Sequence, residues 1–250
     1  MKFIWTLIGS VILLFLYMWR NAFRNRVMYN EMEAFGQPEE VRFFFLSDSH
    51  ARLIHPSIIR RAKGQVDFVI IGGDFADQRT SLARVEQNLQ RLSELGPIYF
   101  IWGNNDRELG EQTLHQLFAR YNVRILMNDA VALPYENKLW LSAIDDTSSK
   151  YNIVDALAPC PQDAQIIFVS HNPNIFNRVL PHRKPLLMIG GHLHGGQLRL
   201  GRFGMQPHGA FKEENGVQTL VSNGYGTTLV PLRLGAYPET HIVKITIRKQ

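Results

Sequence analysis

The stretch Gly190-Gly191-His192-Leu193-His194-Gly195-Gly196 places two imidazoles on one short backbone segment with glycines on both sides. Glycine leaves room for a ligand to approach the backbone closely. A lone His-x-His pair in a glycine-rich turn fits an ordinary turn about as well as a metal site. This pair is informative because four other polar clusters precede it in the chain.

Each of those clusters comes directly after an apolar run that has the pattern of a buried strand. They are Asp48-Ser49-His50 after residues 41–46, Gly73-Asp74 after 66–71, Gly103-Asn104-Asn105-Asp106 after 97–102, and His171-Asn172 after 164–170. Such strands indicate an α/β protein, in which ligands bind beyond the carboxyl ends of the strands. We therefore expect all five clusters to converge on one place.

The side chains in these clusters offer carboxylate, imidazole and amide oxygen donors, a mixture that suits divalent Mn, Fe, Co, Ni or Zn. The one cysteine, Cys160, lies between two prolines in a predicted loop and takes no part. Seven donors exceed the four of a closed tetrahedral site. The sequence therefore predicts two metal ions with open positions for water and substrate, the arrangement that serves in-line phosphoryl displacement.

The order of the blocks Asp48-x-His50, Gly73-Asp74, Gly103-Asn104-x-Asp106, His171 and Gly191-His192-x-His194 resembles the calcineurin-like metallophosphoesterase superfamily. The resemblance extends from about residue 41 to the C-terminus. Residues 195–198 and 226–235 further resemble its membrane-associated or exported bacterial phosphodiesterases. The fold that this implies is a four-layer αββα sandwich of two mixed β-sheets.

The resemblance also implies a role for each donor. Asp48, His50 and His194 would hold one metal, Asn104, His171 and His192 the other, and Asp74 would bridge them. An attacking hydroxide would lie between the two cations. Manganese is the expected metal, with Fe, Zn, Co or Ni as alternatives.

One position departs from the family pattern. Most members have a histidine that protonates or stabilises the leaving group where this chain has Asn105. Asparagine donates a hydrogen bond but delivers no proton, which favours diesters and pyrophosphates. The alternative is that Asn105 is a neutral replacement. Arg107 and Arg52, close in sequence to predicted ligands, are candidates to bind substrate phosphate, with ordinary surface positions as the alternative.

The N-terminal residues 3–19 are almost entirely apolar and lie between Lys2 and Arg20. Seventeen helical residues reach about 25 Å, which crosses a thin bilayer. Since no small-residue cleavage site follows, an uncleaved single-pass anchor is favoured over a removed signal peptide. Arg20, Arg24 and Arg26 follow the span and place the catalytic domain in the cytoplasm by the positive-inside rule.

Three segments are expected: an anchor over 1–20, a juxtamembrane linker or amphipathic helix over 21–40, and a catalytic domain over 41–250. Helices are predicted at 56–63, 81–95 and 110–122, and later strands at 138–144, 185–189, 217–222 and 241–247. The acidic pair Asp145-Asp146 follows a predicted strand and could face the site, but such pairs are more often solvated loop residues. A net charge of +5 suits a membrane surface or a phosphate substrate, and nucleic acid is not an expected partner.

The function that these features favour is a dinuclear metal-dependent phosphodiesterase or pyrophosphatase at the inner membrane. Its expected substrate is a phospholipid or lipid-linked nucleotide such as UDP-2,3-diacylglucosamine, which is cleaved in lipid A synthesis. The alternatives are a phosphodiesterase with a soluble substrate and a non-enzymatic, metal-dependent scaffold at the membrane.

Overall fold

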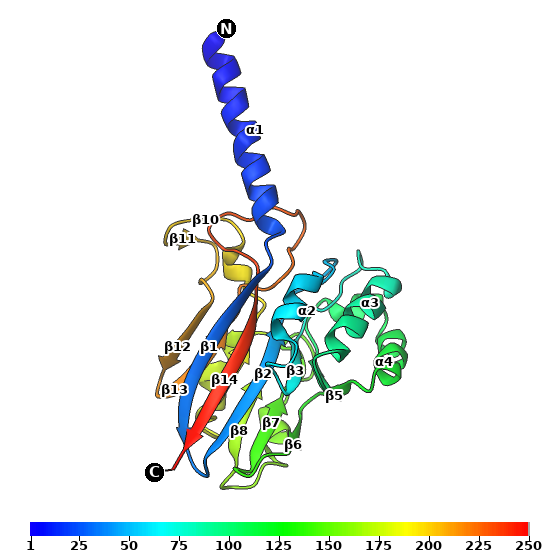
Figure 1. Ribbon diagram of the computed structural model, residues 1–250, viewed down its shortest axis with the longest axis vertical. Coiled ribbons are helices and arrows are strands. Elements are labelled where there is room, and N and C mark those ends of the chain that lie inside the picture. The colour runs from blue at the N-terminus through cyan, green and yellow to red at the C-terminus, as the bar shows by residue number, and fades with distance from the viewer. Residues whose placement is uncertain (250) are drawn as a thin grey trace.

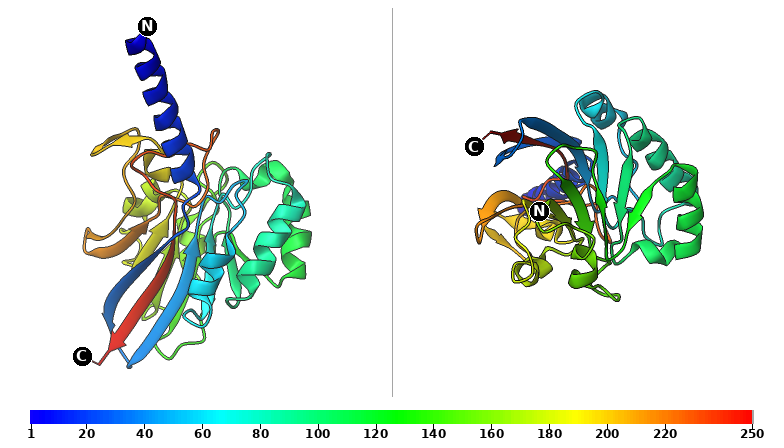
Figure 2. Two further views of the ribbon diagram at one scale, coloured as in Figure 1. Left: turned by 45° about the horizontal axis from the view of Figure 1, so that its top comes forward. Right: turned by 90° about the horizontal axis from the view of Figure 1, so that it is seen from below.

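The computed structural model describes residues 1–249 and shows two six-stranded sheets packed face to face, with helices on both outer faces (Figures 1 and 2). The helices are α1 (Lys2–Ala22), α2 (Pro56–Ala62), α3 (Leu82–Ser93), α4 (Glu111–Arg120), α5 (Ile153–Leu157) and α6 (Phe176–Val179). Short 3₁₀ turns cover Asp106–Leu109, Pro173–Ile175 and His194–Gly196. The predicted four-layer α/β sandwich is confirmed.

The first sheet has the strand order β1-β14-β2-β3-β4-β5, and the second has the order β12-β13-β9-β8-β7-β6. The strands of the first sheet are β1 (Arg26–Phe35), β2 (Glu39–Leu46), β3 (Phe68–Gly72), β4 (Ile98–Ile101), β5 (Arg124–Leu126) and β14 (Glu239–Arg248). Those of the second are β6 (Asp129–Ala132), β7 (Leu139–Ala143), β8 (Gln165–Val169), β9 (Leu187–Gly190), β12 (Ala210–Glu214) and β13 (Val217–Val221). A separate small hairpin joins β10 (Arg199–Leu200) to β11 (Phe203–Gly204). Both large sheets are mixed, because β14 pairs antiparallel to β2 and β6 antiparallel to β7.

Strand alternation divides the apolar interior into three layers. Along β2, Phe43 and Phe45 point between the sheets, whereas Phe44 and Leu46 pack under α2, α3 and α4. A third cluster fills the space between the second sheet and the helices α5 and α6. The second half of β2 and all of β3 are buried on both faces, so these segments are continuous apolar runs in the sequence.

The predicted helices and strands all form, with ends that differ by a few residues. Local signals explain the helix starts, since Pro56 occupies the first turn of α2 and the Ser81 side chain accepts a hydrogen bond from the Arg84 N–H at the start of α3. The interpretation of residues 21–40 as linker or amphipathic helix is wrong. Residues 26–35 form β1, a ten-residue strand parallel to β14.

Helix α1 is the one described helix that is long and apolar enough to cross a membrane. It projects from one end of the sandwich and its side chains are mostly exposed (Figure 1). Its last turn is the exception, because Met18, Asn21 and Ala22 are buried against the domain. The Met18 carbonyl accepts a hydrogen bond of 3.0 Å from the Arg233 N–H. The helix is therefore docked on the sandwich at its C-terminal end.

Candidate metal centre

The predicted ligands lie at the carboxyl ends of strands from both sheets. Asp48 and His50 follow β2, and Asp74 follows β3. From the second sheet, His171 follows β8, and the 192–194 pair follows β9. Both sheets therefore bring their ligands to one edge of the sandwich, as the strand pattern predicts.

Three buried side chains form the first cluster. Nε2 of His194 lies 3.2 Å from Nε2 of His50 and 3.2 Å from Oδ1 of Asp48. Three donor atoms from the loops after β2 and β9 thus lie close together.

The second cluster consists of Asp74, His171 and His192. Nε2 of His171 lies 3.2 Å from Nδ1 of His192 and 3.4 Å from Oδ2 of Asp74. The same Asp74 oxygen is 3.8 Å from Nε2 of His50 in the first cluster. Asp74 therefore lies between the two clusters, where a bridging carboxylate is expected.

These spacings fit bound cations. Donor atoms about 2.1 Å from one ion in tetrahedral or octahedral geometry lie about 3.0–3.4 Å from each other. In each cluster, two of the three separations are 3.2–3.4 Å, and all are within 4.8 Å. Each cluster combines two imidazoles, which are neutral donors, with a carboxylate, which is an anionic donor. Divalent ions prefer this combination.

The backbone at the ligands is strained. Asp48, His50, Asp74, His192 and His194 all have positive φ, between 47° and 66°. Residues with side chains rarely adopt this region, and such strain persists where the surrounding structure holds a functional arrangement in place. Two glycines also allow the ligands to approach closely. A Cβ at Gly191 would lie 2.4 Å from Asp48 Oδ2, and one at Gly103 would lie 2.2 Å from the Asp74 nitrogen.

Residues 41–196, which include every predicted ligand, match the sequence profile of the calcineurin-like phosphoesterase family. The chain belongs to this family. It is accordingly a metal-dependent phosphoester hydrolase.

Curated relatives cover most of the phosphoesterase. Protein YpbG of Bacillus subtilis is 38% identical over 214 residues, which are 84% of this chain and 82% of YpbG. Phosphodiesterase YaeI of Escherichia coli is 26% identical over 226 residues, 82% of each chain. These alignments extend the likeness well beyond residues 41–196.

Solved structures share the fold at low sequence identity. The NAD nucleotidase NadN of Haemophilus influenzae has a TM-score of 0.50 at 15% identity, over 76% of this chain and 46% of that one. A Staphylococcus aureus protein described as a 5′-nucleotidase has a TM-score of 0.51 at 11% identity, over 85% and 55%. The phosphoesterase thus spans about half the length of these chains.

Burial and charge act against each other at the ligands. Burial alone would raise the pKa of the Asp48 carboxyl, but the imidazoles of His194 and its neighbours hold that pKa below its usual range. Burial lowers the pKa of His194, which keeps this imidazole neutral and able to donate a lone pair. Burial acts the same way on His171, but the adjacent Asp74 outweighs it and raises the pKa of His171 to about 10. A cation would therefore displace a proton when it binds there.

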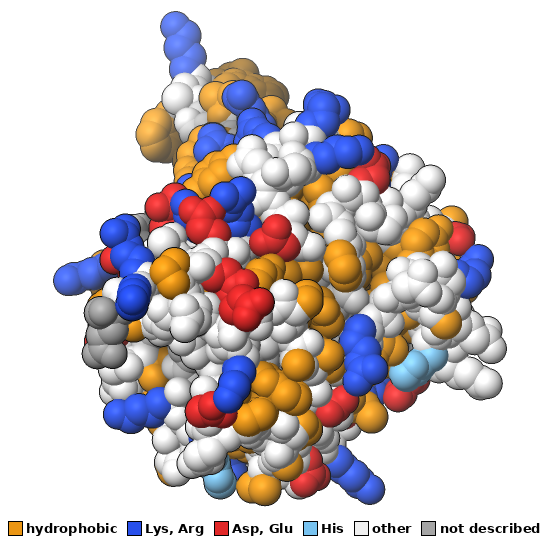
Figure 3. Space-filling view, turned by 60° about the horizontal axis from the view of Figure 1, so that its bottom comes forward, with side chains coloured by type: hydrophobic (Ala, Val, Ile, Leu, Met, Phe, Trp, Pro, Cys, Tyr) orange, Lys and Arg blue, Asp and Glu red, His pale blue; other side chains and the backbone are white. Residues whose placement is uncertain are grey.

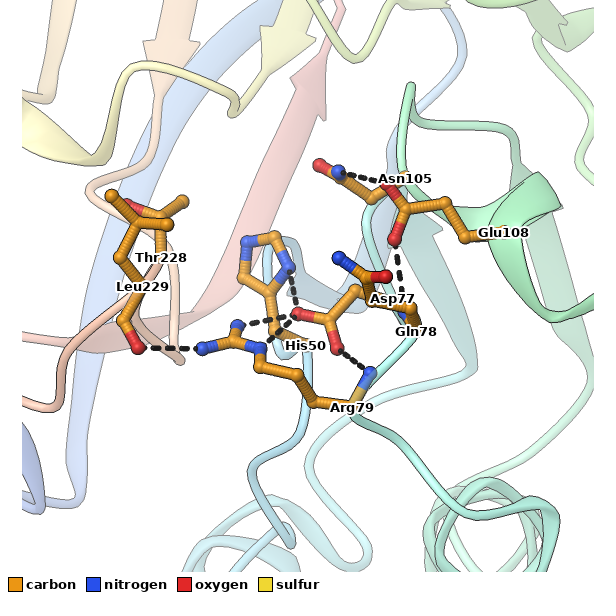
Figure 4. A pocket seen from close by; sticks show the side chains of 8 residues that line it. All are labelled: His50, Asp77, Gln78, Arg79, Asn105, Glu108, Thr228 and Leu229. Carbon is orange, nitrogen blue, oxygen red and sulfur yellow. Dashed lines mark hydrogen bonds and ion pairs between the residues drawn. The ribbon is translucent and has the colours of Figure 1, made fainter.

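Sequence reasoning missed the residues that orient the ligands. Oδ2 of Asp77 lies 3.2 Å from Nδ1 of His50 (Figure 4). The His171 Nδ1–H donates to the Gly72 carbonyl at 2.9 Å, which directs Nε2 toward the cluster. The acidic residue three positions after Asp74 was a signal for Asp77, because loop residues beside a ligand often support it.

Two further buried side chains fix the surrounding loops. Asp106 accepts hydrogen bonds from the N–H groups of Asp74, Ala76 and Gly103, and burial raises the pKa of its carboxyl to about 7. Arg233 is fully buried and donates to several backbone carbonyls, among them that of His194. Nothing in the local sequence separates this arginine from a surface one.

The two asparagines after β4 are linked to each other. Nδ2 of Asn104 donates to Oδ1 of Asn105 at 2.8 Å, so Oδ1 of Asn104 remains available to a cation. The Asn105 N–H donates to Oδ1 of Asp74, and its side chain donates to Glu108. Asn105 lines a pocket of about 230 Å³ together with His50, Asp77, Gln78, Arg79, Glu108, Thr228 and Leu229 (Figure 4).

The arginines predicted to bind phosphate are both engaged within the protein. Nη2 of Arg107 donates to both carboxylate oxygens of Asp145, at 2.8 and 3.0 Å, and Nε of Arg107 donates to Glu111. Arg52 donates to the Tyr225 carbonyl at 2.6 Å and lies over that tyrosine ring. The solvated-loop interpretation of Asp145-Asp146 is wrong, because both residues are buried. Arg79 lines the pocket beside His50, and it too is held within the protein, by Asp77 and by the Thr227 and Leu229 carbonyls.

Proposed function

We propose that this phosphoesterase is a membrane-anchored, two-metal phosphodiesterase or pyrophosphatase whose substrate is a phospholipid or a lipid-linked nucleotide. The observation on which the two-metal part rests is the position of Asp74 between two ligand clusters. Manganese is the metal we expect, since carboxylate, amide and imidazole donors suit it.

The chain's own residues define how a phosphoester would bind. Asp48, His50 and His194 would hold one cation, and His171, His192 and Asn104 the other, with Asp74 shared. Two divalent ions bound in this way supply Lewis acidity for in-line displacement at phosphorus. Asn105 lines the adjoining pocket, where the N–H of its side-chain amide that does not bond Glu108 can donate to a substrate oxygen.

The preference for diesters rests on Asn105. Its amide is fixed by Asn104 and Glu108 at the edge of the pocket. An amide donor stabilises charge on a leaving group but does not protonate it, so leaving groups of low pKa are favoured. Phosphodiesterase YaeI, a relative over most of the chain, is named for the same reaction class.

The preference for a lipid rests on α1. An apolar helix docked beside the catalytic loops would hold the site at a membrane, where amphiphilic substrates are concentrated. UDP-2,3-diacylglucosamine is one such substrate, with a pyrophosphate bond and two acyl chains.

The test uses full-length protein, stripped with chelator and reloaded with Mn, Fe, Zn, Co or Ni. Hydrolysis of bis-p-nitrophenyl phosphate, p-nitrophenyl phosphate and UDP-2,3-diacylglucosamine would be compared at measured metal content. We expect two ions per chain and a higher kcat/KM for the diesters. Lipid mass spectrometry after depletion of the protein would then identify the substrate by its accumulation. A fully loaded protein that hydrolyses none of the esters would favour the scaffold alternative.

A further inference from the structure

The metal centre lies at the end of the sandwich from which α1 emerges. Strand β1 leaves the helix and runs away from it, and β2 returns beside β14 (Figure 1). In register, Phe45 near the end of β2 pairs with His241, which pairs with Met28 near the start of β1. The loop that follows β2, which contains Asp48 and His50, is thus level with the base of α1. A membrane spanned by α1 would lie on the side of the catalytic loops.

Contacts at the base of the helix fix its direction relative to the site. Beside the Met18 to Arg233 hydrogen bond, the Tyr17 and Tyr237 hydroxyls lie 3.2 Å apart. The guanidinium of Arg24 lies 4.5 Å from the centre of the Tyr237 ring. The segment that contacts α1 is continuous with the loop that lines the pocket, so the helix is not a free tether.

Two segments beside this base expose large apolar side chains. The first is the β10–β11 hairpin with its flanks, residues 198–205, and the second is the pocket loop, residues 227–232. Both surround the lower end of α1 in Figure 1. We call the two segments together the apolar rim. Its most exposed apolar members are Leu200 (74%), Phe203 (69%), Met205 (91%) and Leu229 (89%).

The apolar rim is held in place by the polar side chains of Arg199 and Gln197. Arg199 is buried and donates to the carbonyls of Gly195 and Arg202 within the hairpin. The Gln197 side chain bonds the Thr228 N–H and the Val230 carbonyl in the pocket loop. The apolar side chains of the rim therefore project from an ordered backbone. Their exposure is not the result of disordered loops.

Positive charge accompanies this apolar surface. Arg20, Arg24 and Arg202 are exposed around it. A cavity of about 270 Å³ between the helix base and the pocket loop is lined by Phe23 and by arginines that include Arg79. At the opposite end of the sandwich, by contrast, acidic and basic side chains are mixed on the surface (Figure 3). Apolar side chains with flanking arginines suit the interface of an anionic leaflet.

We propose that the apolar rim is a second membrane contact, which inserts Leu200, Phe203 and Met205 into the leaflet surface beside α1. The occupant is the bilayer because the rim is continuous with a bilayer-spanning helix and carries arginines that match anionic headgroups. The proposal rests on α1 as an anchor. It deepens the proposed function, because Leu229 belongs to the rim and also lines the substrate pocket. A headgroup would pass from the leaflet to the metal centre without leaving the surface.

The first experiment places a probe on the rim. Full-length Cys160→Ser protein with Met205→Cys is labelled with an environment-sensitive fluorophore and reconstituted into vesicles of phosphatidylcholine and phosphatidylglycerol at 7:3. The matched control is Gln37→Cys, in the β1–β2 turn at the far end of the sandwich. We expect a blue shift and quenching by 5-doxyl phosphatidylcholine at position 205 and neither at position 37.

Equal, weak quenching at both positions, with the α1 tryptophans still quenched, would overturn the proposal. So would efficient crosslinking between two copies through position 205, which would make the rim a contact between protomers. This readout requires no catalysis. If the fluorophore at position 205 is quenched but no vesicle lipid is hydrolysed, the result supports the membrane contact and contradicts the proposal of a lipid substrate.

The second experiment removes the apolar side chains. In Leu200→Ser/Phe203→Ser/Met205→Ser, we expect unchanged metal content and an unchanged rate on bis-p-nitrophenyl phosphate, which shows that the centre is intact. Hydrolysis of phosphatidylglycerol in vesicles should fall by about tenfold. Phe35→Ser/Val154→Ser, two exposed apolar positions away from the rim, should lose nothing. An equal loss in both variants would contradict the proposal.

Discussion

Asp74 lies between the two ligand clusters, and a shared carboxylate both binds two cations and offsets their repulsion. We expect Asp74→Ala to lose both metals and His171→Ala to keep one. The kcat/KM of Asp74→Ala should be at least about tenfold below that of His171→Ala. Elemental analysis at saturating manganese measures the metal content. Wild-type content in Asp74→Ala would show that the carboxylate does not bridge.

Asp77 contacts no expected cation and acts through His50 as a positioning residue. Its carboxylate is fixed by Arg79 and lies against the far nitrogen of the imidazole. Asp77→Asn should weaken metal binding by about 10–100-fold. Excess metal should restore most of the activity, a rescue that a folding defect would not show. Asp163→Asn, an exposed carboxylate paired with Lys138, is the matched control and should titrate like wild type.

Asn105→His restores an imidazole where the family places its leaving-group acid. The gain on a poor alkyl leaving group should lie at or below the roughly 10²–10⁴-fold range of general acid catalysis. The measurement is kcat/KM for an alkyl monoester and a diester at matched metal content. Glu108, which now bonds the Asn105 amide, is positioned to hold the new ring. An unchanged monoester-to-diester ratio would remove Asn105 as the determinant of substrate class.

The sequence predicted that these candidate ligands lie together, because each comes shortly after a strand whose last residues are mainly buried and apolar. It could not predict the pairing of Arg107 with Asp145 or of Arg52 with Tyr225, since the partners are 38 and 173 residues away in the chain. Whether an arginine is free for a substrate depends on long-range packing. The burial of Arg233 could not be predicted for the same reason, because the loops that cover it meet only in the folded chain.

At the scale of elements, β1 shows why an edge strand escapes detection. Its side chains alternate between exposed and partly buried, and charged residues interrupt the apolar ones, so the segment has the composition of a linker. Its register with β14 is nonetheless continuous over ten residue pairs. The strand therefore belongs to the catalytic domain, although the sequence pattern placed the start of that domain at residue 41.

This placement predicts where the chain tolerates truncation. A chain that begins at residue 24 keeps β1 and should fold with metal content and activity on a soluble diester like those of the full chain. One that begins at residue 37 exposes the edge of β14 and should melt about 10 °C lower or aggregate. Thermal denaturation followed by circular dichroism decides between these outcomes. Equal melting temperatures would mean that β1 contributes little to the sheet.

At the scale of the whole molecule, the docked helix and the candidate metal centre share one end. Under the proposed anchoring by α1, the side of the membrane on which the domain lies would decide which leaflet supplies a lipid substrate. Arg20, Arg24 and Arg26 follow the span, and Arg24 and Arg26 lie against Tyr237 of the domain. These charges favour retention of the domain in the cytoplasm.

We expect protease added to intact spheroplasts to spare the domain and to digest it only after permeabilisation. The chain should keep its N-terminus, because Met18, Asn21 and Ala22 are buried against the domain. Digestion in intact spheroplasts would reverse the topology and assign the substrate to the outer leaflet. A mature N-terminus after residue 20 would instead make α1 a removed signal, and the apolar rim would then have no anchored membrane beside it.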